Sequence, residues 1–181
     1  AFRPEADITN KQAYFWLGLM IIGIFLSSIF IFWHQSLRLD EAQSLYQTNR
    51  SFGGMLKLVA QDVHVPLYHT LLHFWLQLFD NSITSARALS TILFCLTVLV
   101  TYKLGSYATN SKRVGLFGAF LVAASPFMHW YGNEARMYGL LALFTVSSQY
   151  LFLKLVKEGP DKKIFLLYTL SAVLGIYSHY F

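Results

Sequence analysis

One apolar segment limits the possible fold of this chain more than any other feature of the sequence. The run from Tyr14 to Trp33 carries no charged side chain and would reach about 30 Å as a helix, enough to cross a bilayer core. Trp16 and Trp33, near its two ends, suit the two membrane–water interfaces. Only 13% of the 181 residues are charged, about half the share found in soluble domains. These features predict an all-α membrane protein.

Further apolar segments predict about five transmembrane helices in a single module, residues 1–181. The spans are expected at about 14–33, 84–107, 114–131, 134–156 and 164–181, with an outer loop at 34–83. The third span is expected to bend or end near Ser125-Pro126, because proline interrupts the helical hydrogen bonds. Asn133 is a good N-cap, so the next helix is expected to begin at Glu134.

The segment from Pro66 to Phe79 is predicted to be an amphipathic juxtamembrane helix in the first outer loop. It would reach only about 20 Å, too short for a comfortable span. On a helical wheel, one face carries His69, Thr70, His73 and Gln77, and leucines and aromatic residues fill the other. The i, i+4 spacing of the two histidines would also suit a divalent metal. The water-facing side of an interfacial helix explains them more simply.

Basic residues lie in short clusters between the apolar segments, which argues against nucleic-acid binding despite the net charge of +5. With the N-terminus inside and segment 66–79 lying flat, nine of the fourteen lysines and arginines are cytoplasmic. If that segment crosses and the N-terminus is outside, ten are inside, so the count alone does not choose between the two arrangements. The flat arrangement is preferred because it collects the polar motifs at one outer face. Those motifs contain Asp40, Glu41, His64, Arg87, Glu134, Arg136 and His179.

Two arginines at that face suggest a phosphate site. Arg87 and Arg136 are each expected in the first turn of a helix, where the helix dipole is already positive and an arginine gains nothing. Two such helix N-termini would bind a phosphate well beside a membrane. Alternatively, both arginines extend to the interface, or Arg136 pairs with Glu134. From the residues alone, both explanations stay open.

Several motifs together resemble those of the GT-C glycosyltransferases, closest to protein O-mannosyltransferases and aminoarabinose transferases. In chain order they are Asp40-Glu41, Asp62 to Tyr68 (DVHVPLY), Arg87 to Ser90 (RALS), Ser125 to Phe127 (SPF), Trp130 to Tyr138 (WYGNEARMY) and Tyr177 to Phe181 (YSHYF). Val65 stands where the family pattern has the first of two prolines. Family members are much longer, so the chain is expected to be the N-terminal part of a longer enzyme.

The resemblance implies a glycosyltransferase that moves a sugar from a polyprenyl phosphate to a lipid, glycan or protein acceptor, with inversion. It places the active site on the outer, periplasmic face of a cell membrane, with a bacterial inner membrane expected. No cofactor is implied with certainty and no metal ligand is assigned, although a divalent metal could take part. The alternative is a non-catalytic membrane subunit, or a polyprenyl-phosphate-binding protein, that keeps the same scaffold.

The resemblance also assigns roles to individual residues. Asp40 would be the general base that takes the proton of the acceptor, and Glu41 would orient its loop. Arg87 would bind the phosphate of the donor, where a cation stabilises the charge that builds up as the phosphate leaves. Phosphate binding is also expected of Arg136. The residues expected to support the site are His64, Glu134 and His179.

Overall fold

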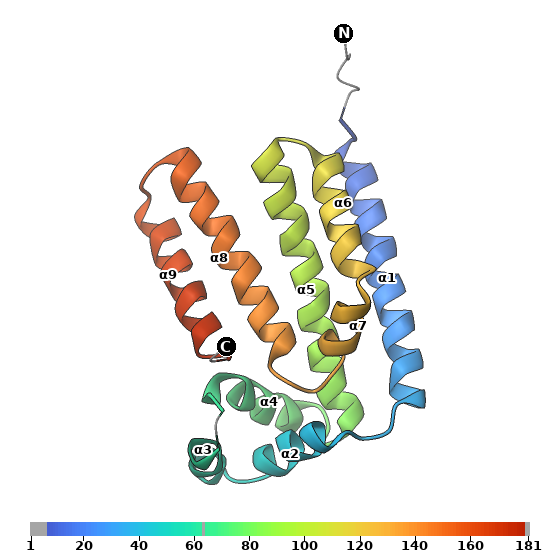
Figure 1. Ribbon diagram of the computed structural model, residues 1–181, viewed down its shortest axis with the longest axis vertical. Helices are drawn as coiled ribbons and strands as arrows, with labels where there is room; N and C mark the ends of the chain where they lie inside the picture. The colour runs from blue at the N-terminus through green and yellow to red at the C-terminus, as the bar shows by residue number, and fades with distance from the viewer. Residues whose placement is uncertain (1–6, 63, 180–181) are drawn as a thin grey trace.

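The computed structural model describes residues 7–62 and 64–179, and the regular structure in these ranges is entirely helical (Figure 1). The helices are α1 (Asn10–His34), α2 (Leu39–Thr48), α3 (Phe52–Gln61), α4 (Pro66–Leu78), α5 (Ile83–Thr109), α6 (Lys112–Ala123), α7 (Pro126–Gly132), α8 (Tyr138–Glu158) and α9 (Lys162–Ile176). The all-α class predicted from the sequence is confirmed. The last two residues of the motif that ends at Phe181 lie outside the described ranges.

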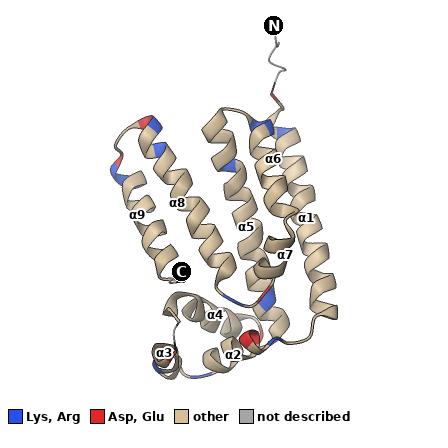
Figure 2. Ribbon diagram, viewed as in Figure 1, with Lys and Arg blue, Asp and Glu red and all other residues tan. Residues whose placement is uncertain are grey.

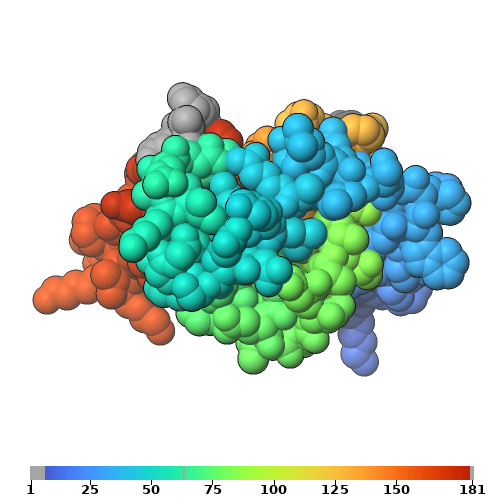
Figure 3. Space-filling model, turned by 90° about the horizontal axis from the view of Figure 1, so that it is seen from below, coloured from blue at the N-terminus to red at the C-terminus, as the bar shows by residue number. Residues whose placement is uncertain are grey.

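The helix α5 is central to the bundle, where it packs against α1, α6 and α8, while α9 packs against α8. Glycine allows the closest of these approaches. A Cβ atom at Gly115 of α6 would lie 2.6 Å from the carbonyl oxygen of Tyr102 in α5, so a larger residue would push the two helices apart. The short helices α2, α3 and α4 cover one end of the bundle (Figures 1 and 3).

Three helices, α1, α5 and α8, are long and apolar enough to cross a membrane, and α6 with α7 makes a fourth span if the pair is counted together. The pair is bent by 62°, and α7 begins at Pro126, as the sequence predicted. By length and composition, the described residues therefore contain three or four candidate spans, where about five were predicted. When α6 and α7 are counted as one span, the remaining difference is α9, whose 15 residues reach about 22 Å, less than a bilayer core needs.

Helix α4 lies across the end of the bundle (Figure 1). Its polar face was predicted to be exposed to water, but the two histidines on that face are buried. His69 and His73 are only 1% and 3% exposed, whereas the apolar side chains of Phe74 and Leu78 are exposed. The polar face packs against α2 and α3, and Nδ1 of His73 lies 2.9 Å from the carbonyl oxygen of Thr48. The interpretation of these histidines as a water-facing surface is therefore wrong.

The predicted start of a helix at Glu134 is also wrong. Helix α7 ends at Gly132, α8 begins at Tyr138, and Asn133 is the C-cap of the first rather than the N-cap of the second. The side-chain oxygen of Asn133 accepts hydrogen bonds from two hydroxyl groups of other helices, so it is not available to cap a helix here. The residues between the two helices form a short non-helical segment, 133–137, that reaches the end covered by α2.

Candidate active site

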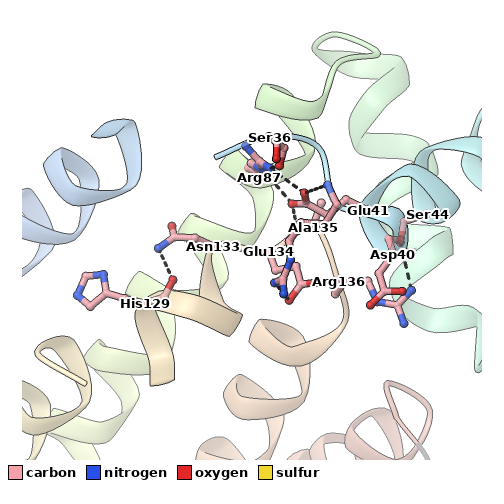
Figure 4. Close-up of polar contacts among 11 residues, drawn as sticks. Ser36, Asp40, Glu41, Ser44, Arg87, His129, Asn133, Glu134, Ala135 and Arg136 are labelled. Atoms are coloured by element: carbon pink, nitrogen blue, oxygen red, sulfur yellow. Dashed lines mark hydrogen bonds and ion pairs between the residues drawn. The ribbon is translucent and has the colours of Figure 1, made fainter. Parts of the chain in front are cut away.

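Glu41 in α2 and Arg87 in α5 form a buried ion pair at the end of the helix bundle that α2, α3 and α4 cover (Figure 4). Nη2 of Arg87 lies 2.7 Å from Oε2 of Glu41, and Nε lies 2.9 Å from Oε1. Glu41 is completely buried and Arg87 is 2% exposed. The guanidinium also donates to the carbonyl oxygens of Gln35, at 3.0 Å, and Ser36, at 3.1 Å. The pair therefore ties the segment after α1 to α2 and α5.

The Glu41 carboxylate accepts two further hydrogen bonds from the backbone. The N–H of Ala135 lies 3.1 Å from Oε1, and the N–H of Arg38 lies 3.2 Å from Oε2. Burial would by itself raise the pKa of Glu41, but the hydrogen bonds from Arg87, Ala135 and Arg38 hold that pKa below its usual value. Glu41 is thus a fixed anion with donors on both oxygens, which suits a positioning residue better than a base.

The neighbouring carboxylate is in a different environment. Asp40 is exposed, and within the ranges that the structure describes its carboxylate makes no hydrogen bond or ion pair. Its backbone carbonyl oxygen accepts a hydrogen bond from the hydroxyl of Ser44 at 3.1 Å. Figure 4 shows Glu41 turned toward Arg87 and Ala135, with Asp40 apart from that pair. Of the two adjacent carboxylates, Asp40 is therefore the one that another molecule can reach.

Arg136 lies in the segment 133–137 and is 7% exposed. Its Nη2 lies 2.9 Å from Nε2 of His64, and its Nη1 lies 3.5 Å from the carbonyl oxygen of Asp40. Because a guanidinium only donates, Nε2 of His64 must accept, and the imidazole proton is on Nδ1. That nitrogen lies 3.1 Å from Oδ2 of Asp62. Arg136 is thus connected through His64 to the end of α3.

Two glutamines complete this connection. The Asp62 carboxylate accepts a hydrogen bond from Nε2 of Gln47 at 2.9 Å and another from Nε2 of Gln43, both in α2. The Nε of Arg136 is buried and has no hydrogen-bond partner among the described residues. Arg136 therefore keeps a donor for a further acceptor, in contrast to Arg87, whose donors are largely occupied.

Glu134 is paired with Arg38. Nη1 of Arg38 lies 3.1 Å from Oε2 of Glu134, and the guanidinium carbon lies 4.6 Å from the centre of the Trp130 ring. Burial raises the pKa of Glu134, and the charge of Arg38 partly offsets that effect. Arg38 was not predicted as a site residue, because an arginine that precedes two acidic residues has no distinctive sequence signal.

Asn133 has a different role from the helix N-cap predicted for it. Its Oδ1 accepts hydrogen bonds from the hydroxyls of Ser28, at 2.5 Å, and Thr91, at 3.0 Å, and its Nδ2 donates to the carbonyl oxygen of His129 at 2.8 Å. It is 1% exposed. These bonds join α1, α5 and α7, and they hold the segment 133–137 in place. The two adjacent serines, Ser27 and Ser28, inside an otherwise apolar span were the available signal.

The remaining predicted residues have simple placements. Neither arginine is in the first turn of a helix, since Arg87 is the fifth residue of α5 and Arg136 precedes α8. His179 follows α9 at the same end, with its ring centre 5.9 Å from that of Tyr138. His69 and His73, the pair whose spacing would suit a divalent metal, are not both free to bind one. Both ring nitrogens of His73 are engaged, by the carbonyl oxygen of Thr48 and by Nε2 of Gln77, at 2.9 Å each. Among the described residues, no group of three or more metal-binding side chains is arranged to hold an ion.

The chain matches the family described as dolichyl-phosphate-mannose-protein mannosyltransferase over residues 63–181. That range contains His64, Arg87, Glu134 and Arg136, and it begins after Asp40 and Glu41. The segment 133–137 and the Arg87 end of α5 are therefore features of the matched region, and α2 supplies the two adjacent carboxylates from outside it. No curated protein and no solved structure matches the chain.

Proposed function

Because the chain belongs to the dolichyl-phosphate-mannose-protein mannosyltransferase family, a family of membrane glycosyltransferases, we propose that it uses a sugar carried on a polyprenyl phosphate. The sugar passes to a lipid, glycan or protein acceptor at the outer face of the membrane. The configuration at the anomeric carbon is inverted, because the acceptor oxygen attacks from the side opposite the departing phosphate. The end covered by α2, α3 and α4 is the catalytic end.

The observation that carries this proposal is the contrast between two adjacent carboxylates. Glu41 is buried, with donors on both oxygens, whereas Asp40 is exposed and forms no side-chain hydrogen bond within the described ranges. Carboxylates whose environments differ in this way commonly divide the roles of a site between them. Asp40 takes the proton of the acceptor hydroxyl as its oxygen bonds to the anomeric carbon, and Glu41 holds α2 against α5 and segment 133–137.

The departing phosphate needs a cation. As the bond between the anomeric carbon and the phosphate oxygen breaks, its electron pair stays on that oxygen, and the phosphate gains a negative charge. Arg136 suits this charge because its buried Nε lacks a hydrogen-bond partner among the described residues. Arg87, the other arginine expected to bind phosphate, reaches it only if Glu41 releases part of the guanidinium, so its contacts favour a positioning role.

The test is transfer by the full-length protein in membranes, with labelled polyprenyl-phosphate sugars as donors. Asp40→Asn keeps the shape and removes the basicity, so transfer should fall by about 10²- to 10⁴-fold while donor binding is largely retained. Asp80→Asn changes another exposed carboxylate near the same end and should leave the rate unchanged. Transfer by Asp40→Asn at the wild-type rate would show that Asp40 is not the base. A wild-type protein that binds donor without turnover would support the non-catalytic alternative.

Donor affinity distinguishes the two arginines. Arg136→Lys keeps the charge but not the planar set of donors, so it should weaken donor binding while the protein stays folded. Arg87→Lys should chiefly lower stability, because it disrupts the buried contacts with Glu41 and two carbonyl groups. If a folded Arg87→Lys protein loses donor affinity and Arg136→Lys does not, the assignment of the phosphate to Arg136 is reversed.

A further inference from the structure

A shallow, open surface cavity of about 390 Å³ is lined by residues from the end of α5, the start of α6 and the chain before α1. These elements meet at the end of the bundle opposite the candidate active site (Figure 1). The cavity also includes one residue of α8. Its lining includes three phenols and three charged side chains, which are Tyr102, Tyr107, Tyr150, Asp7, Lys103 and Lys112. The proposed sugar transfer uses none of these residues.

The lysines in this cavity differ from the other lysines nearby. Nζ of Lys157 donates to the carbonyl oxygens of Tyr107 and Ala108 at 2.9 Å each, and Lys154 lies 3.7 Å from Glu158. Those two ammonium groups are therefore occupied. Lys103 is exposed and forms no hydrogen bond or ion pair within the described part of the chain, and Nζ of Lys112 reaches only the carbonyl oxygen of Ile8, at 3.4 Å.

Asp7, the carboxylate among the described lining residues, is held by backbone groups. Asp7 accepts hydrogen bonds from the N–H of Lys112 at 2.6 Å and the N–H of Arg113 at 3.2 Å. The Lys112 N–H is the largest cause that lowers the pKa of Asp7, so this carboxylate stays charged. Among the described residues, two lysines and one aspartate give the lining one positive charge, which a single phosphodiester group neutralises.

The position of the cavity indicates where that phosphodiester comes from. The cavity lining includes residues of α5 and α8, two helices that are long and apolar enough to span a membrane. Figure 2 shows that lysines and arginines gather at this end of the bundle. The rings of Tyr107 and Tyr150 lie edge to face with their centres 5.7 Å apart. Tyrosine is enriched at the level of lipid headgroups, where a phosphate meets the ends of such helices. Lysines near that surface attract anionic lipids.

We propose that this cavity binds the headgroup of one anionic phospholipid, with the phosphate between Lys103 and Lys112. The lipid then fixes the depth of the basic end in the membrane. This site is separate from the proposed transfer reaction, so its failure would leave that proposal untouched.

The experiment counts lipids bound to the full chain in neutral detergent micelles by native mass spectrometry, with phosphatidylglycerol as the probe. The wild type should retain one phosphatidylglycerol and bind phosphatidylcholine more weakly. A lysine near an anionic lipid contributes about fivefold in affinity, so Lys103→Gln with Lys112→Gln should weaken binding about 25-fold. Lys162→Gln with Lys163→Gln is the matched control, because it removes the same charge at the same end outside the cavity.

Each other outcome overturns the proposal. Equal weakening by the two pairs would mean general attraction to basic residues, and no change in either pair would mean that the cavity does not bind the lipid. Displacement of the lipid by an equal concentration of inorganic phosphate would assign the cavity to free phosphate. The single variant Lys103→Gln separates a loss of lipid binding from a loss of folding, because Lys103 is exposed. Its affinity for the lipid should fall about fivefold while its melting temperature stays unchanged.

Discussion

The two ends of the helix bundle use charged residues in different ways (Figure 2). At the end covered by α2, the side chains of Glu41, Arg87 and Glu134 are at most 4% exposed, and their ion pairs join segments far apart in the chain. At the basic end, Glu158 is 46% exposed and pairs with Lys154 one helical turn away. A buried charge is tolerated only when it has well-placed partners. The positions of the charged side chains are therefore fixed at the end covered by α2 and not at the basic end.

The largest effect should come from breaking the buried pair. Glu41→Gln leaves the charge of Arg87 buried without its carboxylate, which should lower the free energy of unfolding by about 3–5 kcal/mol. The measurement is denaturant unfolding in detergent micelles, compared with the wild type at neutral pH. A loss below about 1 kcal/mol would show that the buried pair behaves like an ordinary surface pair.

The hydrogen bonds of Asn133 should have the next largest effect. Asn133→Ala removes the acceptor shared by Ser28 and Thr91, so the free energy of unfolding should fall by about 2–3 kcal/mol. Ser28→Ala added to Asn133→Ala should cost less than Ser28→Ala in the wild type, because their hydrogen bond is already lost. Additive losses in this double-mutant cycle would mean that the two side chains are not coupled.

His69, one of the two buried histidines of α4, should make the stability of the protein depend on pH. Burial, and next the nearby His64, lower the pKa of His69 to about 4 from 6.5. The folded protein therefore keeps His69 neutral, while the unfolded chain takes up a proton as the pH falls below about 6.5. This contribution to stability is fully present above about pH 6.5 and is lost progressively down to about pH 4. Between pH 6.5 and 5 the loss should be about 2 kcal/mol.

The measurement is the free energy of unfolding across that pH interval, for the wild type and for His69→Gln. The variant should show a shallower dependence on pH, since it has no imidazole at this position. His34→Gln removes an exposed histidine at the end of α1 and should leave the slope as it is. An identical slope in His69→Gln would assign the pH dependence to other groups.

The smallest effect is expected at the basic end. Glu158→Gln removes an exposed i, i+4 pair with Lys154, so the free energy of unfolding should change by less than about 0.5 kcal/mol. Unfolding under the conditions used for Glu41→Gln makes the two variants directly comparable. A loss similar to that of Glu41→Gln would remove the distinction between the two ends.

Much of the architecture was predictable because its causes are local. The break at Ser125-Pro126 follows from proline itself, and α4 begins at Pro66, a residue that suits the first turn of a helix. The start of α8 was missed because Asn133 was assigned a local capping role. Its actual partners, Ser28 and Thr91, are 105 and 42 positions away. The polar face of α4 was misassigned for the same reason, since α2 and α3 cover it.

The adjacent residues Asp40 and Glu41 show what can be predicted from the sequence and what depends on the tertiary structure. The sequence by itself determined that apolar helices of membrane length flank a polar loop with two carboxylates, because hydropathy and length are properties of single segments. Only the tertiary structure decided which carboxylate is buried against Arg87, 46 positions away, and which is left exposed. Neighbouring positions on a helix point about 100° apart, so the packing of α2 against α5 and segment 133–137 selects one of them for burial.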